Sequence, residues 1–248
     1  MIEKLLMPHI PEKFTDDPGY RAGHIRVINP LPGTRILGLH IPEMKKIARE
    51  LARSQEAVSL HGSFLAETVL FHEEKMVWGL MLDYMKIPLE KRFELFSGFI
   101  PRIDNWAVCD TVCAAARWAS PVDAVWNYLR RWWGSGREFE VRFAIIMSMT
   151  YFLDEHWLPE VFGRIDSLDF SRISSDYVKG RRPAEGTVSG PAPYYVRMGT
   201  AWLLATALAK FPDMTRAYVR DSKLPEDVLK LYARKARESF RTRTVSPF

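Results

Sequence analysis

Apolar residues recur at helical spacing along most of this 248-residue chain. The regular pattern begins with Met44, Ile47, Ala48 and Leu51, and charged residues occupy the positions between them. No stretch shows sustained two-residue alternation bounded by turn signals, so strands are not required anywhere. The periodicity therefore predicts an all-α fold.

The expected helices are mostly roughly ten to eighteen residues long and are joined by short links. They span residues 43–51, 64–71, 74–85, 89–99, 104–118, 121–133, 138–153, 157–168, 194–210, 212–220 and 225–239. Short links favour antiparallel neighbours, and the pairs recur about every forty residues, which is the spacing of HEAT-like repeats. We expect one domain over residues 1–248, built as a superhelical stack of antiparallel helix pairs with a concave surface suited to a long ligand.

Two segments depart from this pattern. Residues 1–40 carry five prolines, so we expect an irregular N-terminal segment in which any helix is short. Residues 176–193 are rich in glycine, proline and basic residues, and we interpret them as a loop insertion. A loop of this length in a compact domain is either functional or mobile, so it either adds a contact to a ligand or covers the binding surface.

The positive charge is concentrated in the last third of the chain. From Asp176 onward there are fourteen Lys and Arg against seven Asp and Glu, a net charge of +7, whereas the whole chain carries +5. The first 175 residues therefore carry −2. This asymmetry favours a polyanionic partner, with nucleic acid ahead of an anionic membrane, although a solvated basic helix end explains the same charges.

Cys109 and Cys113 are the two cysteines, four residues apart on an expected helix. A disulfide there is strained and two sulfurs without nearby histidines make a poor zinc site, so we expect two buried free thiols. Free thiols fit a reducing cytosol. The N-terminus does not resemble a secretory signal and no apolar run reaches the length of a membrane span, so we expect a cytoplasmic protein without a membrane partner.

Trp106 and Asp110 form the first candidate for a functional pair. Their four-residue spacing places the aromatic ring and the carboxylate on one face of a helix. A separate apolar stripe, Val108, Val112, Ala115 and Ala119, supplies the packing face of that helix. The acid therefore lies beside an aromatic ring and away from the core. Glycine-rich phosphate loops, metal-ligand spacings and serine-nucleophile motifs are not found in the sequence.

Two other expected helices carry residues that simple core filling does not explain. Arg142 lies inside an apolar run, so its charge must be paired or directed into a cleft. Trp202 is large among small residues that allow close helix approach. Each residue also has a structural explanation, since an ion pair between Asp110 and Arg142 accounts for both charges and tryptophans most often serve packing.

Several separate blocks in this sequence resemble the AlkD-like family of DNA alkylation repair glycosylases. The similarity extends from about Ile36 to Arg243. It rests on residues 36–48, 103–110, 137–143, 194–204 and 235–239. This resemblance implies an all-helical superhelix of HEAT-like repeats, in agreement with the periodicity. It also implies hydrolysis of the N-glycosidic bond of N3- and N7-alkylated purines in duplex DNA, without enclosure of a flipped base.

The resemblance assigns the family's site positions to Asp110, Trp106, Arg142 and Trp202. Asp110 is then expected to stabilise the sugar cation and orient water, the two tryptophans to contact the deoxyribose, and Arg142 to hold a phosphate. We expect DNA contacts from Arg181, Arg182, Arg197, Arg234, Lys235, Arg237, Arg241 and Arg243. No cofactor, metal or Schiff-base lysine is needed, and we expect a monofunctional, monomeric enzyme. The alternative is a non-catalytic HEAT-like module that binds nucleic acid or a protein.

Overall fold

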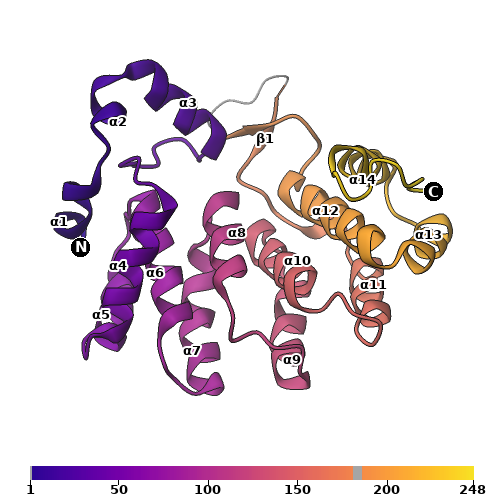
Figure 1. The fold of residues 1–248 in the computed structure, drawn as a ribbon, viewed down its shortest axis with the longest axis horizontal. Coiled ribbons are helices and arrows are strands. Elements are labelled where there is room, and N and C mark those ends of the chain that lie inside the picture. Colours follow the sequence, from indigo (N-terminus) through magenta and orange to yellow (C-terminus); the bar gives the residue numbers. More distant parts are fainter. Residues whose placement is uncertain (1, 181–185) are drawn as a thin grey trace. The chain divides into compact units, whose positions relative to one another are not determined.

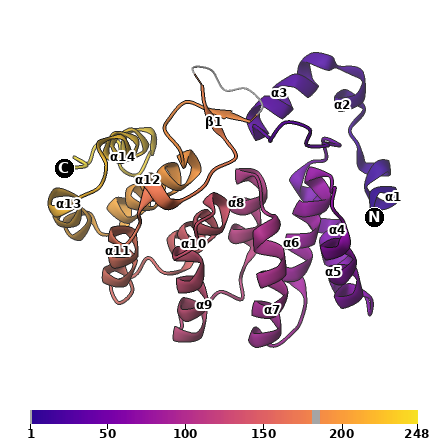
Figure 2. The same ribbon diagram turned by 180° about the vertical axis from the view of Figure 1, so that it is seen from behind.

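The computed structural model describes residues 2–180 and 186–248, and their regular secondary structure is almost entirely helical (Figures 1 and 2). The helices are α1 (Glu3–Leu6), η1 (Met7–His9), α2 (Glu12–Asp16), α3 (Pro18–Ile28), α4 (Ile41–Arg53), α5 (Ala57–Ala66), α6 (His72–Tyr84), α7 (Leu89–Phe99), η2 (Ile100–Arg102), α8 (Trp106–Ala115), α9 (Asp123–Trp133), α10 (Glu138–Tyr151), α11 (Leu158–Asp166), η3 (Phe170–Arg172), α12 (Tyr194–Lys210), α13 (Pro212–Asp221) and α14 (Glu226–Glu238). The predicted all-α class is confirmed. The sequence pattern required no strand, and the structure has one short pair, in which β1 (Val178–Lys179) pairs with β2 (Thr187–Val188) inside the expected loop insertion.

The chain divides into two compact units. The first comprises residues 1–118 and 182–187, and the second comprises residues 119–181 and 188–248. The expectation of a single domain over 1–248 stays a prediction. No described helix combines the length and the apolar character that a bilayer crossing demands.

In the first unit, α6 packs against α4 and α8, while α5 and α7 pack on α6 and on each other (Figure 1). Trp78 of α6 is fully buried and stacks on Phe64 with ring centroids 5.2 Å apart, and its Nε1–H donates to Nδ1 of His61 over 3.1 Å. A Cβ atom at Gly79 would lie 2.5 Å from Val112 of α8. Glycine at this position therefore permits the close approach of α6 and α8.

The N-terminal segment contains more helix than its prolines suggested. α1 and α2 are short, as expected, but α3 has 11 residues. Pro18 occupies the first turn of α3, where a proline nitrogen needs no hydrogen-bond partner, and the Asp17 carboxylate accepts from the Tyr20 N–H over 2.9 Å. Asn29 then ends the helix in the left-handed conformation. A proline expected to interrupt helical structure thus starts a helix.

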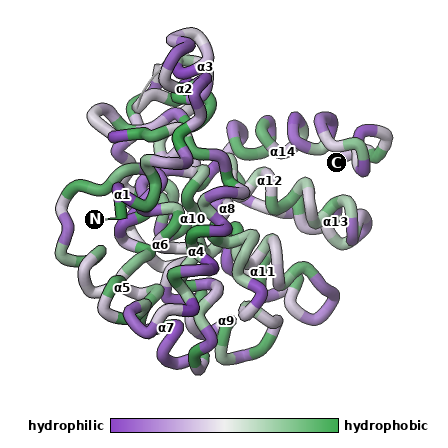
Figure 3. The backbone as a smooth tube through the Cα atoms, turned by 60° about the vertical axis from the view of Figure 1, so that its left-hand side comes forward, coloured by the Kyte–Doolittle hydropathy of each residue, from purple (hydrophilic) through white to green (hydrophobic). Residues whose placement is uncertain are grey.

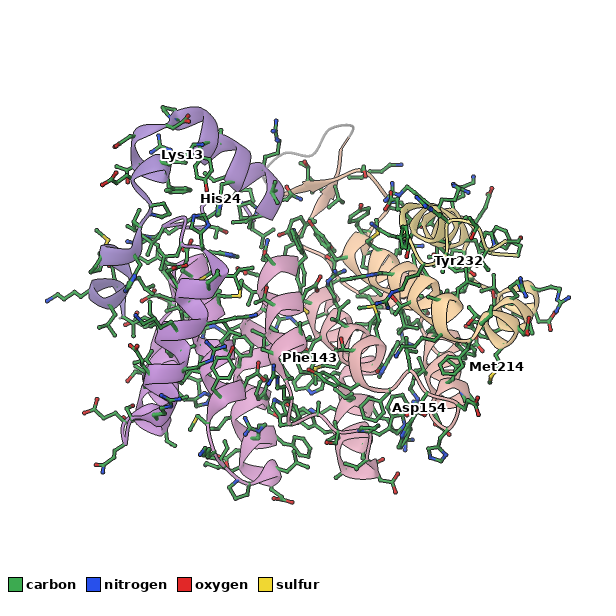
Figure 4. All side chains as sticks on the ribbon, in the orientation of Figure 1. Lys13, His24, Phe143, Asp154, Met214 and Tyr232 are labelled. Carbon is green, nitrogen blue, oxygen red and sulfur yellow. The ribbon has the colours of Figure 1, made fainter. Side chains whose placement is uncertain are left out.

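In the second unit, α10 packs against α9 and α12, and α12 packs against α13 and α14. Phe143 of α10 and Tyr232 of α14, both labelled in Figure 4, are fully buried. The Tyr232 hydroxyl donates to the Pro247 carbonyl over 2.8 Å, which ties the C-terminal segment to α14. Hydrophilic and hydrophobic positions alternate along α14, so that one side of this helix is apolar (Figure 3).

The predicted helices 89–99 and 194–210 have the bounds observed for α7 and α12. The predicted helix 64–71 is wrong in position, because α5 spans Ala57–Ala66 and residues 67–71 lie outside any helix. Leu70 and Phe71 are buried in this connection, and the Glu74 carboxylate accepts from the Phe71 N–H over 3.0 Å. These buried apolar residues belong to the connection between α5 and α6, and the sequence pattern assigned them to the end of a helix.

Candidate functional site

Asn105 fixes the start of α8 and therefore the position of Trp106. Its side-chain oxygen accepts from the Ala107 N–H over 2.8 Å, which is the expected N-cap bond. Its amide nitrogen donates to the Ile28 carbonyl over 2.9 Å, at the last residue of α3. Because Asn105 is 2% exposed and uses both polar groups, the first turn of α8 is anchored to α3. The predicted helix 104–118 is accordingly longer than α8 at both ends.

Trp106 and Asp110 lie one turn apart on α8, and both side chains are half-buried. Val108 and Val112, which the sequence assigned to the packing stripe, are fully buried on the core side. Cys109 and Cys113, which share a helical face with Trp106 and Asp110, are also fully buried, so the separation of the ring and the carboxylate from the packing side stays a prediction. Their roles in chemistry stay predictions.

A buried charge pair lies beside the start of α8. Lys75, in the first turn of α6, forms an ion pair and hydrogen bond with Asp104, which immediately precedes the Asn105 cap. Both side chains are largely shielded, with 14% of Lys75 and 28% of Asp104 exposed. Burial, with a smaller contribution from the Lys75 charge, lowers the pKa of His72 to about 3, so this imidazole is neutral at pH 7. The segment that leads into α8 is therefore tied to α6 by a largely shielded ion pair.

Arg142 belongs to the second unit and is 3% exposed. Its guanidinium donates to the Tyr195 carbonyl over 2.7 Å and lies 5.6 Å from the centroid of the Tyr195 ring. Glu138, one turn earlier on α10, accepts from the Tyr195 N–H over 2.6 Å, and burial raises the pKa of this carboxyl. The two side chains thus hold the first turn of α12. The structure gives Arg142 a positioning contact, and its predicted contact with a DNA phosphate stays a prediction.

Trp202 lies on α12 with 39% of its surface exposed, and it lines a cavity of about 480 Å³ between α12 and the segment that ends α14. Phe240, which is 80% exposed, also lines this cavity, together with the cations of Lys235 and Arg241 and the carboxylate of Glu238, which pairs with Lys235. The guanidinium of Arg243 lies 4.6 Å from the Phe240 ring centroid. We call Trp202, Phe240, Lys235 and Arg241 the Trp202 pocket. Exposed aromatic rings beside cations are the combination that proteins use to hold unpaired bases and phosphates.

The other predicted DNA-contacting cations differ in how available they are. Arg181 and Arg182 lie outside the described residues. Arg197 is engaged, because its guanidinium forms a two-bond ion pair with Asp227 at 3.0 and 3.1 Å and lies 4.7 Å from the Phe170 ring centroid. On α14 and after it, Arg234 and Lys235 pair with Glu238, whereas Arg237, Arg241 and Arg243 are exposed. The exposed cations therefore gather at the C-terminal end of the second unit.

The two cysteines are free and buried, as predicted. Burial raises the pKa of the Cys113 thiol well above its usual value, and the hydrogen bond to Cys109 adds to this effect. Such a thiol is a poor nucleophile. Within residues 2–180 and 186–248, no three His, Cys, Asp or Glu side chains are grouped so that they could hold a metal ion.

Comparison with known families identifies the chain. Residues 17–173 match the model of a family described as DNA alkylation repair enzyme. This chain belongs to the DNA alkylation repair enzyme family. Neither a curated protein nor a solved structure matches it. Family membership gives the protein a role in DNA alkylation repair and DNA as its partner.

The family match includes Trp106, Asp110 and Arg142, but it ends before α12 and so does not include Trp202 or the C-terminal cations. Trp106 and Asp110 belong to the first unit, and Arg142 and Trp202 to the second. Each pair is described within its own unit. The convergence of all four residues on one site stays a prediction.

The roles of Asn105 and of the pair of Lys75 with Asp104 were not predicted from the sequence. Asn105 carried a usable signal, because an asparagine directly before an apolar-periodic run is a helix start. Lys75 carried none, since its partner is 29 residues away and on another element.

Proposed function

We propose that this member of the DNA alkylation repair enzyme family is a DNA glycosylase. Its substrate is duplex DNA that carries cationic N3- or N7-alkylated purines, and it hydrolyses the bond between the purine and the deoxyribose. The observation that carries the proposal is that Trp106 and Asp110 lie one turn apart on α8, with both side chains half-buried. The family match supports it, because it includes both residues.

The chemistry asks little of a general acid. An alkylated purine already carries a positive charge, so the electron pair of the breaking C1′–N bond neutralises the leaving base. The remaining requirement is to stabilise the positive charge that develops on the sugar and to place a water molecule. Water then forms the new C1′–O bond and gives up a proton. Asp110 supplies a carboxylate for both tasks, since it attracts the sugar cation and accepts the proton from water.

The aromatic residues are suited to holding the cationic alkylated purine. Trp106 and Trp202 each present a half-buried or exposed ring, and such rings attract cations through their faces. Non-specific affinity for DNA comes from the exposed cations Arg237, Arg241 and Arg243, because contacts with phosphates are independent of sequence.

The test is release of 7-methylguanine from methylated duplex DNA under single-turnover conditions. We expect Asp110→Asn to reduce the excision rate by about 10² to 10³-fold, because it removes the carboxylate that faces the developing charge. The matched control is Asp16→Asn, an exposed carboxylate on α2 of the same unit, which we expect to leave the rate unchanged. Equal background rates for wild type and Asp110→Asn would refute the glycosylase assignment.

One observation favours a second candidate, a non-catalytic module that binds nucleic acid or a protein. Two of the predicted DNA-contacting arginines, Arg142 and Arg197, are engaged in contacts within the second unit. A protein that binds DNA in a salt-sensitive manner and excises no base would fit this module. Absence of DNA binding at low salt would leave only a protein-binding version.

A further inference from the structure

A second basic pocket lies in the first unit, at the opposite end of α6 from Lys75. It has a volume of about 680 Å³ and is formed where α4 and α6 end and α5 begins. Lys75 occupies the first turn of α6, whereas Tyr84 is its last residue and lines this pocket. Since α6 has 13 residues and rises about 1.5 Å per residue, the pocket is separate from the start of α8.

Three cations line this pocket and no carboxylate does. Arg49 and Arg53 come from the last turns of α4, and Lys86 follows the end of α6. Glu50 and Glu56 belong to the same stretch of chain but do not line it. Within residues 2–180 and 186–248, neither Arg53 nor Lys86 has an ion-pair partner. The pocket therefore carries uncompensated positive charge.

The Tyr84 ring holds one of the three cations in position. The guanidinium of Arg49 lies 4.9 Å from the centroid of the Tyr84 ring, so this cation is held at one side of the pocket. The preceding residue, Asp83, is buried and accepts from the Trp118 Nε1–H over 2.7 Å, and burial raises the pKa of its carboxyl well above the usual value. Asp83 is 8% exposed and does not line the pocket.

The spacing of the two arginines is unfavourable without a ligand. Arg49 and Arg53 are four residues apart on α4, where like charges repel. The negative end of the helix dipole at the end of α4 offsets part of this repulsion. The dipole does not explain why both side chains line the same pocket. An anion between Arg49, Arg53 and Lys86 would relieve the repulsion and pair all three cations.

We propose that the pocket of Arg49, Arg53 and Lys86 binds a phosphate group. The guanidinium groups recognise phosphate oxygens with paired N–H donors, and Lys86 adds a point charge. The phosphate comes either from the DNA backbone or from a free phosphate ion, and the two sources share this chemistry. The site is independent of base excision, since it rests on no residue assigned to the reaction.

The test compares a pocket variant, Arg53→Gln with Lys86→Gln, with a control variant, Arg21→Gln with Lys46→Gln. Both remove two exposed positive charges from the first unit, but Arg21 and Lys46 do not line the pocket. Arg49 is left in place because it contacts Tyr84. A third variant, Arg53→Lys with Lys86→Arg, keeps both charges and is expected to retain more of the phosphate response than the pocket variant. Thermal unfolding of each variant establishes that it is folded.

Two readouts distinguish the sources of phosphate. For free phosphate, inorganic phosphate is expected to raise the Tm of the wild type and the control more than that of the pocket variant. For backbone phosphates, the plot of log affinity for an unmodified duplex against log salt is expected to flatten, by about 0.9 for each phosphate that the variant no longer neutralises. Either result supports the proposal and names the source. A pocket variant that equals the wild type in both readouts overturns it, whether or not the protein excises alkylated bases.

Discussion

The start of α8 and the Trp202 pocket differ in how their residues are held. At α8, Asn105 is 2% exposed, and Lys75 pairs with Asp104 while largely shielded from solvent. In the Trp202 pocket, Trp202 is 39% exposed and Phe240 is 80% exposed. Fixed geometry suits a carboxylate that must face a developing charge, whereas exposed rings and cations suit affinity for a long polyanion. We therefore predict that damage at α8 lowers stability and excision, and that damage at the Trp202 pocket lowers DNA affinity.

The largest expected effect is on stability, from Asn105→Ala. The substitution removes the N-cap of α8 and leaves the buried Ile28 carbonyl without its donor, which together cost about 3 kcal/mol in the free energy of unfolding. Chemical denaturation measures this decrease. Asn127→Ala, an exposed position on α9, is the control and should change stability by less than about 0.5 kcal/mol. Equal effects would mean that the cap does not anchor α8.

The second effect concerns pH and also belongs to the first unit. The folded-state pKa of His72 is about 3, below its usual value of 6.5, so the unfolded chain binds more protons than the folded one between these values. Stability contributed by neutral His72 is therefore present above pH 6.5 and is lost as the pH falls toward 3, by up to about 1.4 kcal/mol per pH unit. Between pH 6.5 and 4.5, His72→Phe should lose less stability than the wild type.

Denaturation at several pH values measures this difference. His156→Phe serves as the control, because His156 is exposed and should leave the wild-type slope intact. A slope in His72→Phe as steep as in the wild type would show that the buried imidazole does not set the pH response of the first unit.

The third effect concerns affinity and belongs to the second unit. Trp202→Ala removes the largest ring from the Trp202 pocket, and removal of one aromatic ring that stacks on a base or sugar costs about 1.4 kcal/mol, or about tenfold in DNA affinity. Fluorescence anisotropy with a short duplex that carries an abasic-site analogue measures this change. Met214→Ala provides a control of comparable exposure on α13 (Figure 4). Lower stability with unchanged affinity would make Trp202 a packing residue.

The smallest effect is on the salt dependence of DNA binding. Arg241→Gln removes one exposed cation from the Trp202 pocket and should reduce the slope of log affinity against log salt by about 0.9. Arg220→Gln, at an exposed position of α13, should leave the slope unchanged if binding uses the C-terminal cations. If both variants show the same slope, the cations of the Trp202 pocket contribute no more to DNA binding than other exposed cations of the second unit.

Local patterns in the sequence predicted most of the helices, and their errors have local causes. The predicted bounds of α7 and α12 match the observed ones, and in the structure a proline stands at the N-cap of each helix, Pro88 and Pro193. α5 was misplaced because the buried residues Leu70 and Phe71 continue an apolar run beyond the end of the helix. Periodicity shows which residues seek the core, but it does not distinguish a helix from a buried connection.

The sequence alone determined the all-α class and the free buried thiols. Both depend on neighbours within a few residues, whose geometry the helix repeat fixes. Only the tertiary structure decided the surroundings of Arg142 and Arg197. Their partners, the Tyr195 carbonyl and the Asp227 carboxylate, lie 53 and 30 residues away in the chain. A charge in an apolar run must find a partner, but packing between helices chooses which one.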